Sequence, residues 1–326
     1  MENEKEILKT FSKLEIDVNF ITKLKGGINS NVYKINSESE KYIIKFFPEN
    51  KKDKRNRFVN ETNFIKFLNK NGIEETIPKI IFEDIEKKFV VYNYIDGTKI
   101  KLIDNNLISN VLVFFRKLYE LKSSKNFEGI QNASEACFSI KEHIEIVMLK
   151  LKNFENLDES CSYSKEVSIW VKDILKLRMK KITKYINKIS YLKNYKIKAE
   201  EKILSTSDVG IHNMIKNDGR FFFYDFEYAG WDDVAKYISD WLLRPNQEMS
   251  VNNQKIFTDG IANIINSSEF RLRMDIMLNI YSVKWCLIIL NKTLDPSLPK
   301  KFKINALNNS IKYFNKYSQK PFFSII

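Results

Sequence analysis

The sequence predicts an α+β fold with two lobes, a small lobe built on an antiparallel sheet and a larger helical lobe. Two observations lead to this prediction. Residues 20–95 contain short apolar runs, rich in aromatic and β-branched residues and separated by turn residues, as in a sheet built from hairpins. From Leu107 onward the apolar spacing becomes helical. The pattern breaks at Asp96-Gly97, so we assign residues 1–96 to the small lobe and 97–326 to the large one.

Composition narrows the class of protein. With 326 residues, 44% of them hydrophobic and 13% aromatic, the chain can bury a large core and is not a disordered protein. Cys137, Cys161 and Cys286 lack metal-ligand spacing, and His143 and His212 are too few for a histidine-based metal site. No apolar run approaches the length of a membrane span, and the first ten residues are charged. We therefore expect a cytoplasmic protein with reduced thiols and no membrane partner.

The net charge of +13 is distributed unevenly along the chain. Residues 1–96 hold 18 Lys/Arg and 16 Asp/Glu, a net charge of +2, which leaves +11 for the remainder. Residues 176–198 contain nine Lys/Arg, no acids and three tyrosines, a composition that can bind single-stranded nucleic acid. Such runs are more often the solvated face of a helix, so we do not expect a nucleic-acid partner.

The small lobe should begin with a short amphipathic helix in the first twenty residues, followed by strands over 20–24 and 32–35. The turn between the two strands contains Gly26 and Gly27, then Asn29 and Ser30. Glycines let backbone amides approach phosphate groups closely, and the two polar side chains could add donors. The alternative is a plain hairpin turn.

A lysine, Lys45, lies within the apolar run of a third predicted strand, 42–47. Burying its ammonium is costly unless it meets a carboxylate or a phosphate. Glu61, sixteen residues later on a predicted helix over 58–68, is a candidate partner. The basic run 51–57 between them is interpreted as a solvated loop. Two more strands are expected over 78–84 and 89–95.

The large lobe should be mostly helical. We expect helices from Leu107 onward and over 143–151, 164–189, 233–243, 256–265, 270–290 and 307–317.

The stretch 204–231 interrupts this helical pattern and contains the residues with the clearest chemistry. Asn217-Asp218-Gly219 is a tight-turn signal between two short apolar runs, which predicts a hairpin. The hairpin would bring Asn213 and Asp225 together at its open end, with Asp208 on the loop that enters it. One carboxylate could orient a hydroxyl while an amide oxygen and a second carboxylate hold Mg²⁺, as phosphoryl transfer requires. Taken singly, each of these residues could instead be a cap or a turn residue.

Taken together, these features resemble the aminoglycoside phosphotransferase and choline kinase superfamily, which has the protein-kinase-like fold. The motifs that carry the resemblance are GGINSNVYKI, YIIKFF with Lys45, Glu61, FVVYNYIDG, SDVGIHN and the triplet Asp225-Phe226-Glu227. They cover roughly residues 20–245. Within the superfamily, TSDVGIHN followed by DFEYAGWDD looks like a bacterial branch of phosphotransferases.

The resemblance implies a kinase that uses ATP (or GTP) and Mg²⁺. Residues 1–96 would form the nucleotide-binding lobe, and residues 97–326 would contain the catalytic loop, the metal site and the acceptor pocket. Nucleotide binding would fall to Gly26, Gly27, Asn29, Ser30, Lys45, Glu61, Tyr92 and Tyr94. Asp208 would accept a hydrogen bond from the attacking hydroxyl, and Asn213 and Asp225 would bind the metal.

The catalytic loop departs from the superfamily at one point. The usual loop begins His-Gly-Asp, whereas Thr206-Ser207 precede Asp208 here. The lost histidine mostly packs and orients the loop, so the carboxylate and the metal ligands remain. We expect His212, next to a metal ligand, to pack or support the loop rather than to act as a general base.

The phosphoryl acceptor is expected to be a neutral or anionic small molecule with a hydroxyl group, such as a sugar or a sugar derivative. A polycationic aminoglycoside would need clustered carboxylates, and the large lobe is strongly basic. Asp232, Asp233, Asp240 and Glu248 are the local acids, and the first two should be occupied by loop and helix-start hydrogen bonds. The alternatives are an aminoglycoside-type antibiotic kinase, a nucleotidyl transferase and a nucleotide- or RNA-binding protein without turnover.

Overall fold

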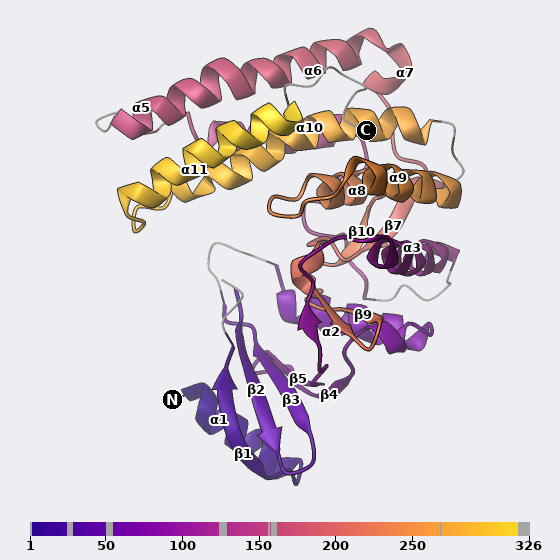
Figure 1. The fold of residues 1–326 in the computed structure, drawn as a ribbon, viewed down its shortest axis with the longest axis vertical. Helices are drawn as coiled ribbons and strands as arrows, with labels where there is room; N and C mark the ends of the chain where they lie inside the picture. Colours follow the sequence, from indigo (N-terminus) through magenta and orange to yellow (C-terminus); the bar gives the residue numbers. More distant parts are fainter. Residues whose placement is uncertain are drawn as a thin grey trace. The chain divides into compact units, whose positions relative to one another are not determined.

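The computed structural model describes residues 2–24, 29–49, 55–123, 129–155, 157, 162–265, 267 and 269–318 (Figure 1). The chain divides into two compact units. The first comprises Met1–Lys101, Ser123–Ser134 and Thr206–Gly230, and the second comprises Leu102–Lys122, Glu135–Ser205 and Trp231–Ile326. Most strands lie in the first unit and most helices in the second, so the predicted α+β class is confirmed.

The first unit is built on a five-stranded antiparallel sheet with strand order β1-β2-β3-β5-β4. The strands are β1 (Val18–Lys23), β2 (Asn31–Ser37), β3 (Lys41–Phe46), β4 (Ile80–Asp84) and β5 (Phe89–Asn93). All five predicted strands are thus present.

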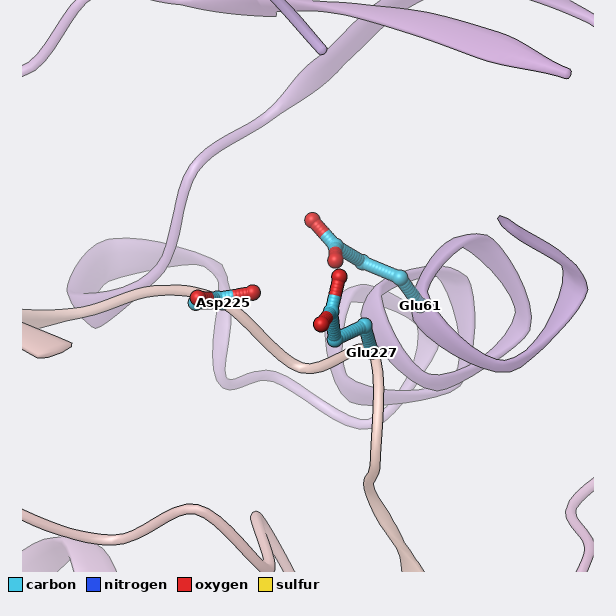
Figure 2. A group of neighbouring side chains, drawn as sticks. All are labelled: Glu61, Asp225 and Glu227. Carbon is cyan, nitrogen blue, oxygen red and sulfur yellow. The ribbon is translucent and has the colours of Figure 1, made fainter. Parts of the chain in front are cut away.

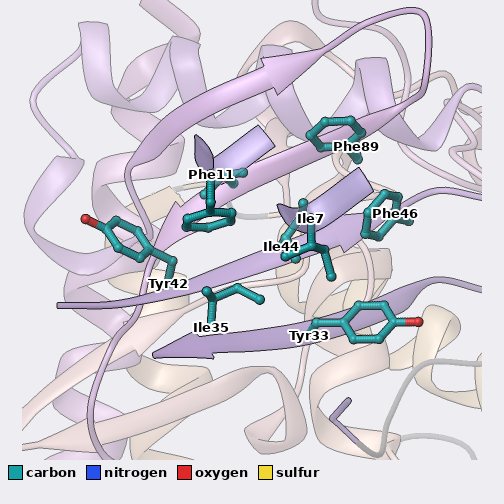
Figure 3. Packing of buried hydrophobic residues seen from close by; sticks show 9 residues of the cluster. Ile7, Phe11, Tyr33, Ile35, Tyr42, Ile44, Phe46 and Phe89 are labelled. Atoms are coloured by element: carbon teal, nitrogen blue, oxygen red, sulfur yellow. The ribbon is translucent and has the colours of Figure 1, made fainter. Parts of the chain in front are cut away.

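One face of this sheet is covered by α1 (Glu2–Lys13). Ile7 and Phe11 of this helix are fully buried against Ile35, Ile44 and Phe89 of the strands (Figure 3). Successive side chains of a strand point to opposite faces, so Lys45, next to Ile44, faces away from α1. There it meets α2 (Arg57–Lys70), which contacts β4 and β5. The lysine is therefore buried by the architecture of the sheet and is not at its edge.

The predicted hairpin is also present. Strands β8 (Met214–Asn217) and β9 (Arg220–Phe223) pair through Asn217 and Arg220, with Asp218 and Gly219 both at positive φ in the turn. The short β6 (Thr98–Lys99) pairs with β8, which gives a three-stranded sheet of order β6-β8-β9. Gly97 makes this approach possible, since a Cβ there would lie 2.8 Å from the Lys216 carbonyl oxygen. By its contacts, the hairpin groups with the N-terminal sheet.

The second unit is a helical assembly around α10 (Phe270–Leu290), which contacts α4, α6, α8 and α11. Its other helices are α3 (Asn105–Glu120), α4 (Ile140–Lys152), α5 (Ser162–Ile169), α6 (Lys176–Lys188), α7 (Ser190–Lys193), α8 (Val234–Leu243), α9 (Val251–Ile265) and α11 (Lys300–Tyr313). It also holds β7 (Lys202–Ser205), which pairs with β10 (Gly230–Asp233). Each predicted helix has a counterpart. The helix expected over 164–189 contains a π-helical stretch, Trp170–Leu175, between α5 and α6.

Two expectations from composition can be compared with the structure. Among the residues that are described, one stretch, Phe270–Thr293, has the length and apolar composition of a membrane span, although 72% of its apolar 18-residue window is buried inside the protein. The expectation that no apolar run reaches this length therefore does not hold for this stretch. It is a mostly buried helix of the protein core, α10 with the turn that follows it. Cys137 and Cys286 are buried free thiols, and Cys161 lies outside the described residues.

A buried ionic network stabilises the start of α8. The Asp233 carboxylate accepts a hydrogen bond from the Ala235 amide (2.9 Å), contacts Arg273 Nη1 (2.9 Å) and lies 3.0 Å from His143 Nε2. Burial alone would raise the pKa of Asp233, but Arg273 and His143 outweigh it and lower the pKa. Burial lowers the pKa of His143. The imidazole is therefore neutral at pH 7, with its proton on Nε2 facing the carboxylate and Nδ1 facing the Tyr281 hydroxyl (3.0 Å).

This arrangement predicts that stability decreases in mild acid. The folded His143 resists protonation while the unfolded chain takes up a proton below about pH 6.5. Its contribution to stability is thus complete above that pH and is lost as the pH falls, with a slope of up to ~1.4 kcal/mol per pH unit per proton. Melting temperatures of wild type and His143→Gln between pH 8 and pH 5 provide the test. The variant should be less stable throughout yet lose less stability on acidification, and parallel curves would refute the role of His143.

Candidate active site

Three carboxylates surround the Lys45 ammonium on β3. Lys45 Nζ lies 2.6 Å from Glu61 Oε2, 2.6 Å from Asp225 Oδ1 and 3.3 Å from Glu227 Oε2. Figure 2 shows Glu61 projecting from α2 toward Asp225 and Glu227, which lie on the segment that follows β9. The predicted pairing of Lys45 with Glu61 is confirmed, and the same lysine also joins the sheet to the segment after the hairpin.

Local structure fixes Glu61 from two sides. It lies in the second turn of α2, whose first turn is capped by the Asn56 side chain accepting from the Val59 amide (3.2 Å). On the other side, the Tyr92 hydroxyl of β5 donates to Glu61 Oε1 (2.7 Å). A buried carboxylate with both oxygens engaged has little freedom to turn away from the lysine. Tyr92, predicted to contact the nucleotide, is thus also a support for Glu61.

The cluster has more negative than positive charge. Ligand oxygens of Glu61, Asp225 and Glu227 all lie within 4.8 Å of one another. Among the described residues, Lys45 and Arg57 form ion pairs with these carboxylates, and Arg57 Nη1 lies 3.9 Å from Glu227 Oε2. With every group ionised, three acids face two bases. The carboxylates would therefore gain from an additional cation.

The pKa shifts reflect this competition. Burial alone would lower the pKa of Lys45, but the three carboxylates outweigh it and raise it, which favours the ammonium form. Burial raises the pKa of Glu61 to about 7, against the attraction of Lys45 and with the added repulsion of Asp225. The raised pKa of Lys45 favours a fully ionised Lys45–Glu61 pair, whereas the raised pKa of Glu61 favours a proton shared between the two side chains. The two 2.6 Å contacts of Lys45 support a charged lysine, and Glu61 is then the carboxylate that burial makes hardest to ionise.

The donor set suits a divalent cation. Carboxylate oxygens are the ligands that Mg²⁺ and Ca²⁺ prefer. Within the described part of the chain, Glu227 Oε2 is buried and accepts no hydrogen bond, so its contact with the lysine does not satisfy it fully. Asp225 has about a third of its side chain exposed and can be reached by a ligand.

The loop before β8 brings Asp208 and Asn213 together. Asn213 Nδ2 donates to the Asp208 carbonyl oxygen (2.9 Å), which leaves the amide oxygen of Asn213 as an acceptor. The Tyr224 amide donates to the Asn213 carbonyl oxygen (3.1 Å), so the hairpin pairing extends to the residue next to Asp225. The hairpin thus places Asn213 opposite Tyr224, the residue before Asp225, and the convergence of the two side chains stays a prediction. Their role as metal ligands stays a prediction.

Asp208 is accessible and is held by its neighbours. About a third of its side chain is exposed, and His212 Nε2 lies 3.2 Å from its Oδ2. Ser207 (φ 61°) and Asp225 (φ 66°) both adopt the left-handed conformation, which costs about 1–3 kcal/mol for such residues and is concentrated at functional sites. His212 thus supports the carboxylate, in line with the expectation that it assists the loop.

The remaining predicted nucleotide contacts are placed as follows. Gly26 and Gly27 lie outside the described residues. Asn29 and Ser30 are half-buried just before β2, and the Asn29 amide donates to the Tyr228 hydroxyl (2.6 Å). The half-buried Tyr94 ring follows β5, with the ammonium of Lys34 4.2 Å from its centre.

One interpretation of the sequence is wrong. Arg57 was assigned to a solvated loop, yet it is buried at the start of α2, where its guanidinium donates to the carbonyl oxygens of Asn29 and Pro48. Lys51, Lys52 and Lys54 of the same run lie outside the described residues. Nothing in the local sequence distinguishes Arg57 from its basic neighbours, because its partners are main-chain groups.

Comparisons with known proteins identify the fold. No protein-family model and no curated protein sequence matches the chain, but solved structures do. The choline kinase LicA from Streptococcus pneumoniae is similar over 97% of this chain and 100% of its own, with 17% identity and a TM-score of 0.62. The amicoumacin kinase hAmiN, solved with AMP-PNP and Ca²⁺, is similar over 99% of this chain and 98% of its own, with 15% identity and a TM-score of 0.63. The aminoglycoside phosphotransferase APH(2")-IIa, solved with streptomycin and ATP, is similar over 94% of this chain and 95% of its own, with 16% identity and a TM-score of 0.60. The chain therefore has the protein-kinase-like fold that choline kinases and aminoglycoside phosphotransferases share.

The geometry predicts that the lysine holds the first unit together. Lys45→Met should lower the free energy of unfolding by ~3–5 kcal/mol, since three neighbouring carboxylates lose their central cation. Millimolar Mg²⁺ should restore part of the loss. The matched control is Lys66→Met on the same helix as Glu61, which removes an exposed ion pair to Glu83 and should cost about 1 kcal/mol or less. Urea unfolding with and without Mg²⁺ measures both, and equal losses in the two variants would contradict the assignment.

Proposed function

We propose that the protein is a small-molecule kinase that transfers the γ-phosphate of ATP (or GTP) to a hydroxyl group. The observation that carries this proposal is the position of Lys45 between Glu61 and Asp225, next to the hairpin end that holds Asn213. A lysine held by a carboxylate can bind nucleotide phosphates, and a second carboxylate with a nearby amide can hold their metal ion. All of these residues belong to the first compact unit.

Each side chain then has a defined task. Lys45 contacts the phosphates, oriented by Glu61, which Tyr92 holds in place. Asp225 and the amide oxygen of Asn213 hold Mg²⁺, which neutralises charge on the phosphates when bound. Asp208 accepts a hydrogen bond from the acceptor hydroxyl and orients it, and His212 keeps the carboxylate in place. Positioning and charge neutralisation supply most of the rate, because phosphoryl transfer needs little covalent help from the protein.

We further propose a neutral or anionic acceptor, such as a sugar or a sugar derivative. The acids that could hold a polycation already have cationic partners in the second unit. Asp232 pairs with Lys236 at 2.6 Å, Asp233 with Arg273 at 2.9 Å, Asp240 with Lys284 at 3.6 Å, and Glu248 with Lys316 at 3.2 Å. The Glu248–Lys316 pair is exposed, but the other three pairs are buried. A ligand with several ammonium groups would have to displace Lys236, Arg273 and Lys284 from them, and separating a buried ion pair is strongly unfavourable.

The direct test is an assay of the wild-type protein with ATP, Mg²⁺ and a panel of small hydroxylated metabolites. The proposal expects one acceptor to gain a phosphoryl group, and Asp208→Asn to lower its turnover ~10²–10⁴-fold, as for the loss of one positioned acid–base group, while binding AMP-PNP normally. The matched control is Asp218→Asn in the exposed turn of the same hairpin, which should leave turnover unchanged. Full turnover by Asp208→Asn would remove this residue from the mechanism.

The same assay decides the finer points. Product mass distinguishes phosphoryl transfer from nucleotidyl transfer, and absence of metal-dependent ATP consumption would favour a binding protein without turnover. Kanamycin-type aminoglycosides belong in the panel beside neutral sugars and sugar phosphates. Aminoglycoside phosphorylation with kcat/KM at or above ~10⁴ M⁻¹s⁻¹, the low end for efficient enzymes, would refute the proposed acceptor class.

A further inference from the structure

Two side chains with no role in the reaction described above join the residues before β2 to the segment that carries Asp225. The first is Tyr228, three residues after Asp225. Its hydroxyl accepts a hydrogen bond from Asn29 Nδ2 at 2.6 Å, across 199 positions of sequence. Asn29 lies two residues before the start of β2 and is one of the residues predicted to contact the nucleotide.

The second is Arg57, at the start of α2. Its buried guanidinium donates to the carbonyl oxygen of Asn29 through Nη1 and to that of Pro48 through Nη2 (2.9 Å), and Nη1 also lies 3.9 Å from Glu227 Oε2. Because Glu227 and Tyr228 are consecutive, the contacts close a ring. The ring runs from Asn29 to Tyr228, along the chain to Glu227, across to Arg57 and back to Asn29.

Other contacts hold Tyr228 in this position. The Ser134 amide donates to the Tyr228 carbonyl oxygen (3.0 Å), and the Arg55 guanidinium lies 4.5 Å from the centre of the Tyr228 ring. Burial, followed by the charge of Glu227, raises the pKa of the Tyr228 hydroxyl, which therefore stays protonated. Backbone, ring and hydroxyl are all engaged, so a displacement of Tyr228 would be transmitted to Asn29.

We propose that Tyr228 and Arg57 are positioning residues that couple nucleotide binding to metal binding. This inference rests on the proposed function, with Asn29 and Ser30 as predicted nucleotide contacts and Asp225 as the metal ligand. With the ring intact, a metal ion that orders the Asp225–Tyr228 segment also orders the backbone at Asn29. Each ligand then raises the affinity for the other by the same factor.

The measurement is the affinity for AMP-PNP with and without Mg²⁺, whose ratio is the coupling factor. Tyr228→Phe, which removes one hydroxyl, should reduce this factor about 3- to 10-fold, the range for a single buried hydrogen bond, with little change in metal-free affinity. Asn29→Ala removes the other partner and should produce the same loss. The double variant should lose less than the sum of the two single variants, since both remove the same Asn29–Tyr228 hydrogen bond.

The matched control is Tyr33→Phe on β2, whose hydroxyl accepts a similar hydrogen bond from Asn3 Nδ2 (3.2 Å) away from the cluster. It should lower the melting temperature about as much as Tyr228→Phe yet leave the coupling factor at the wild-type value. An unchanged factor in Tyr228→Phe, or an equal reduction in Tyr33→Phe, would overturn the inference. If wild type binds AMP-PNP without any effect of Mg²⁺, the proposed function fails and this inference with it. A wild-type effect that survives in Tyr228→Phe refutes the inference alone.

Discussion

One ammonium group shared among three carboxylates determines the structure of the first unit. Lys45 comes from the middle of a sheet, Glu61 from a helix, and Asp225 and Glu227 from a segment about 180 residues away in sequence. Burying a lone lysine would cost several kcal/mol, so the sheet, the helix and the hairpin must come together for β3 to be stable with this residue. The contacts that compensate the buried lysine also hold three carboxylates within 4.8 Å of one another, the arrangement on which the proposed phosphoryl transfer depends. Because the acids outnumber the bases, the cluster still favours an additional cation.

The second unit also buries charged side chains and pairs them with opposite charges, at residues to which the proposed reaction assigns no role. Asp232 and Asp233 precede α8 and are fully buried, and each is matched by a cation, Lys236 or Arg273. His143 completes the network in its neutral form. These pairings stabilise the start of α8 and α10.

Much of this architecture could be predicted from the sequence because the signals are local. Short apolar runs separated by turn residues predict the strands, and the Asn217-Asp218-Gly219 turn predicts the hairpin. The Lys45–Glu61 ion pair could be predicted because a charged residue in an apolar strand needs a partner of opposite charge. Arg57 and Tyr228 were not, since one binds main-chain carbonyls and the other bonds with a side chain 199 positions away. Such partners are determined by the tertiary fold and correspond to no pattern of residue spacing in the sequence.

The most direct test of the account is a crystal structure of the protein with Mg²⁺ and AMP-PNP. Lys45 Nζ lies 2.6 Å from both Glu61 and Asp225, and a metal ion bound by Asp225 would compete with the second of these contacts. The account predicts that the lysine keeps Glu61 and exchanges Asp225 for a phosphate oxygen, and that Asp225 and the Asn213 amide oxygen then bind Mg²⁺. A nucleotide bound elsewhere, with Lys45 still on Asp225, would contradict the central claim.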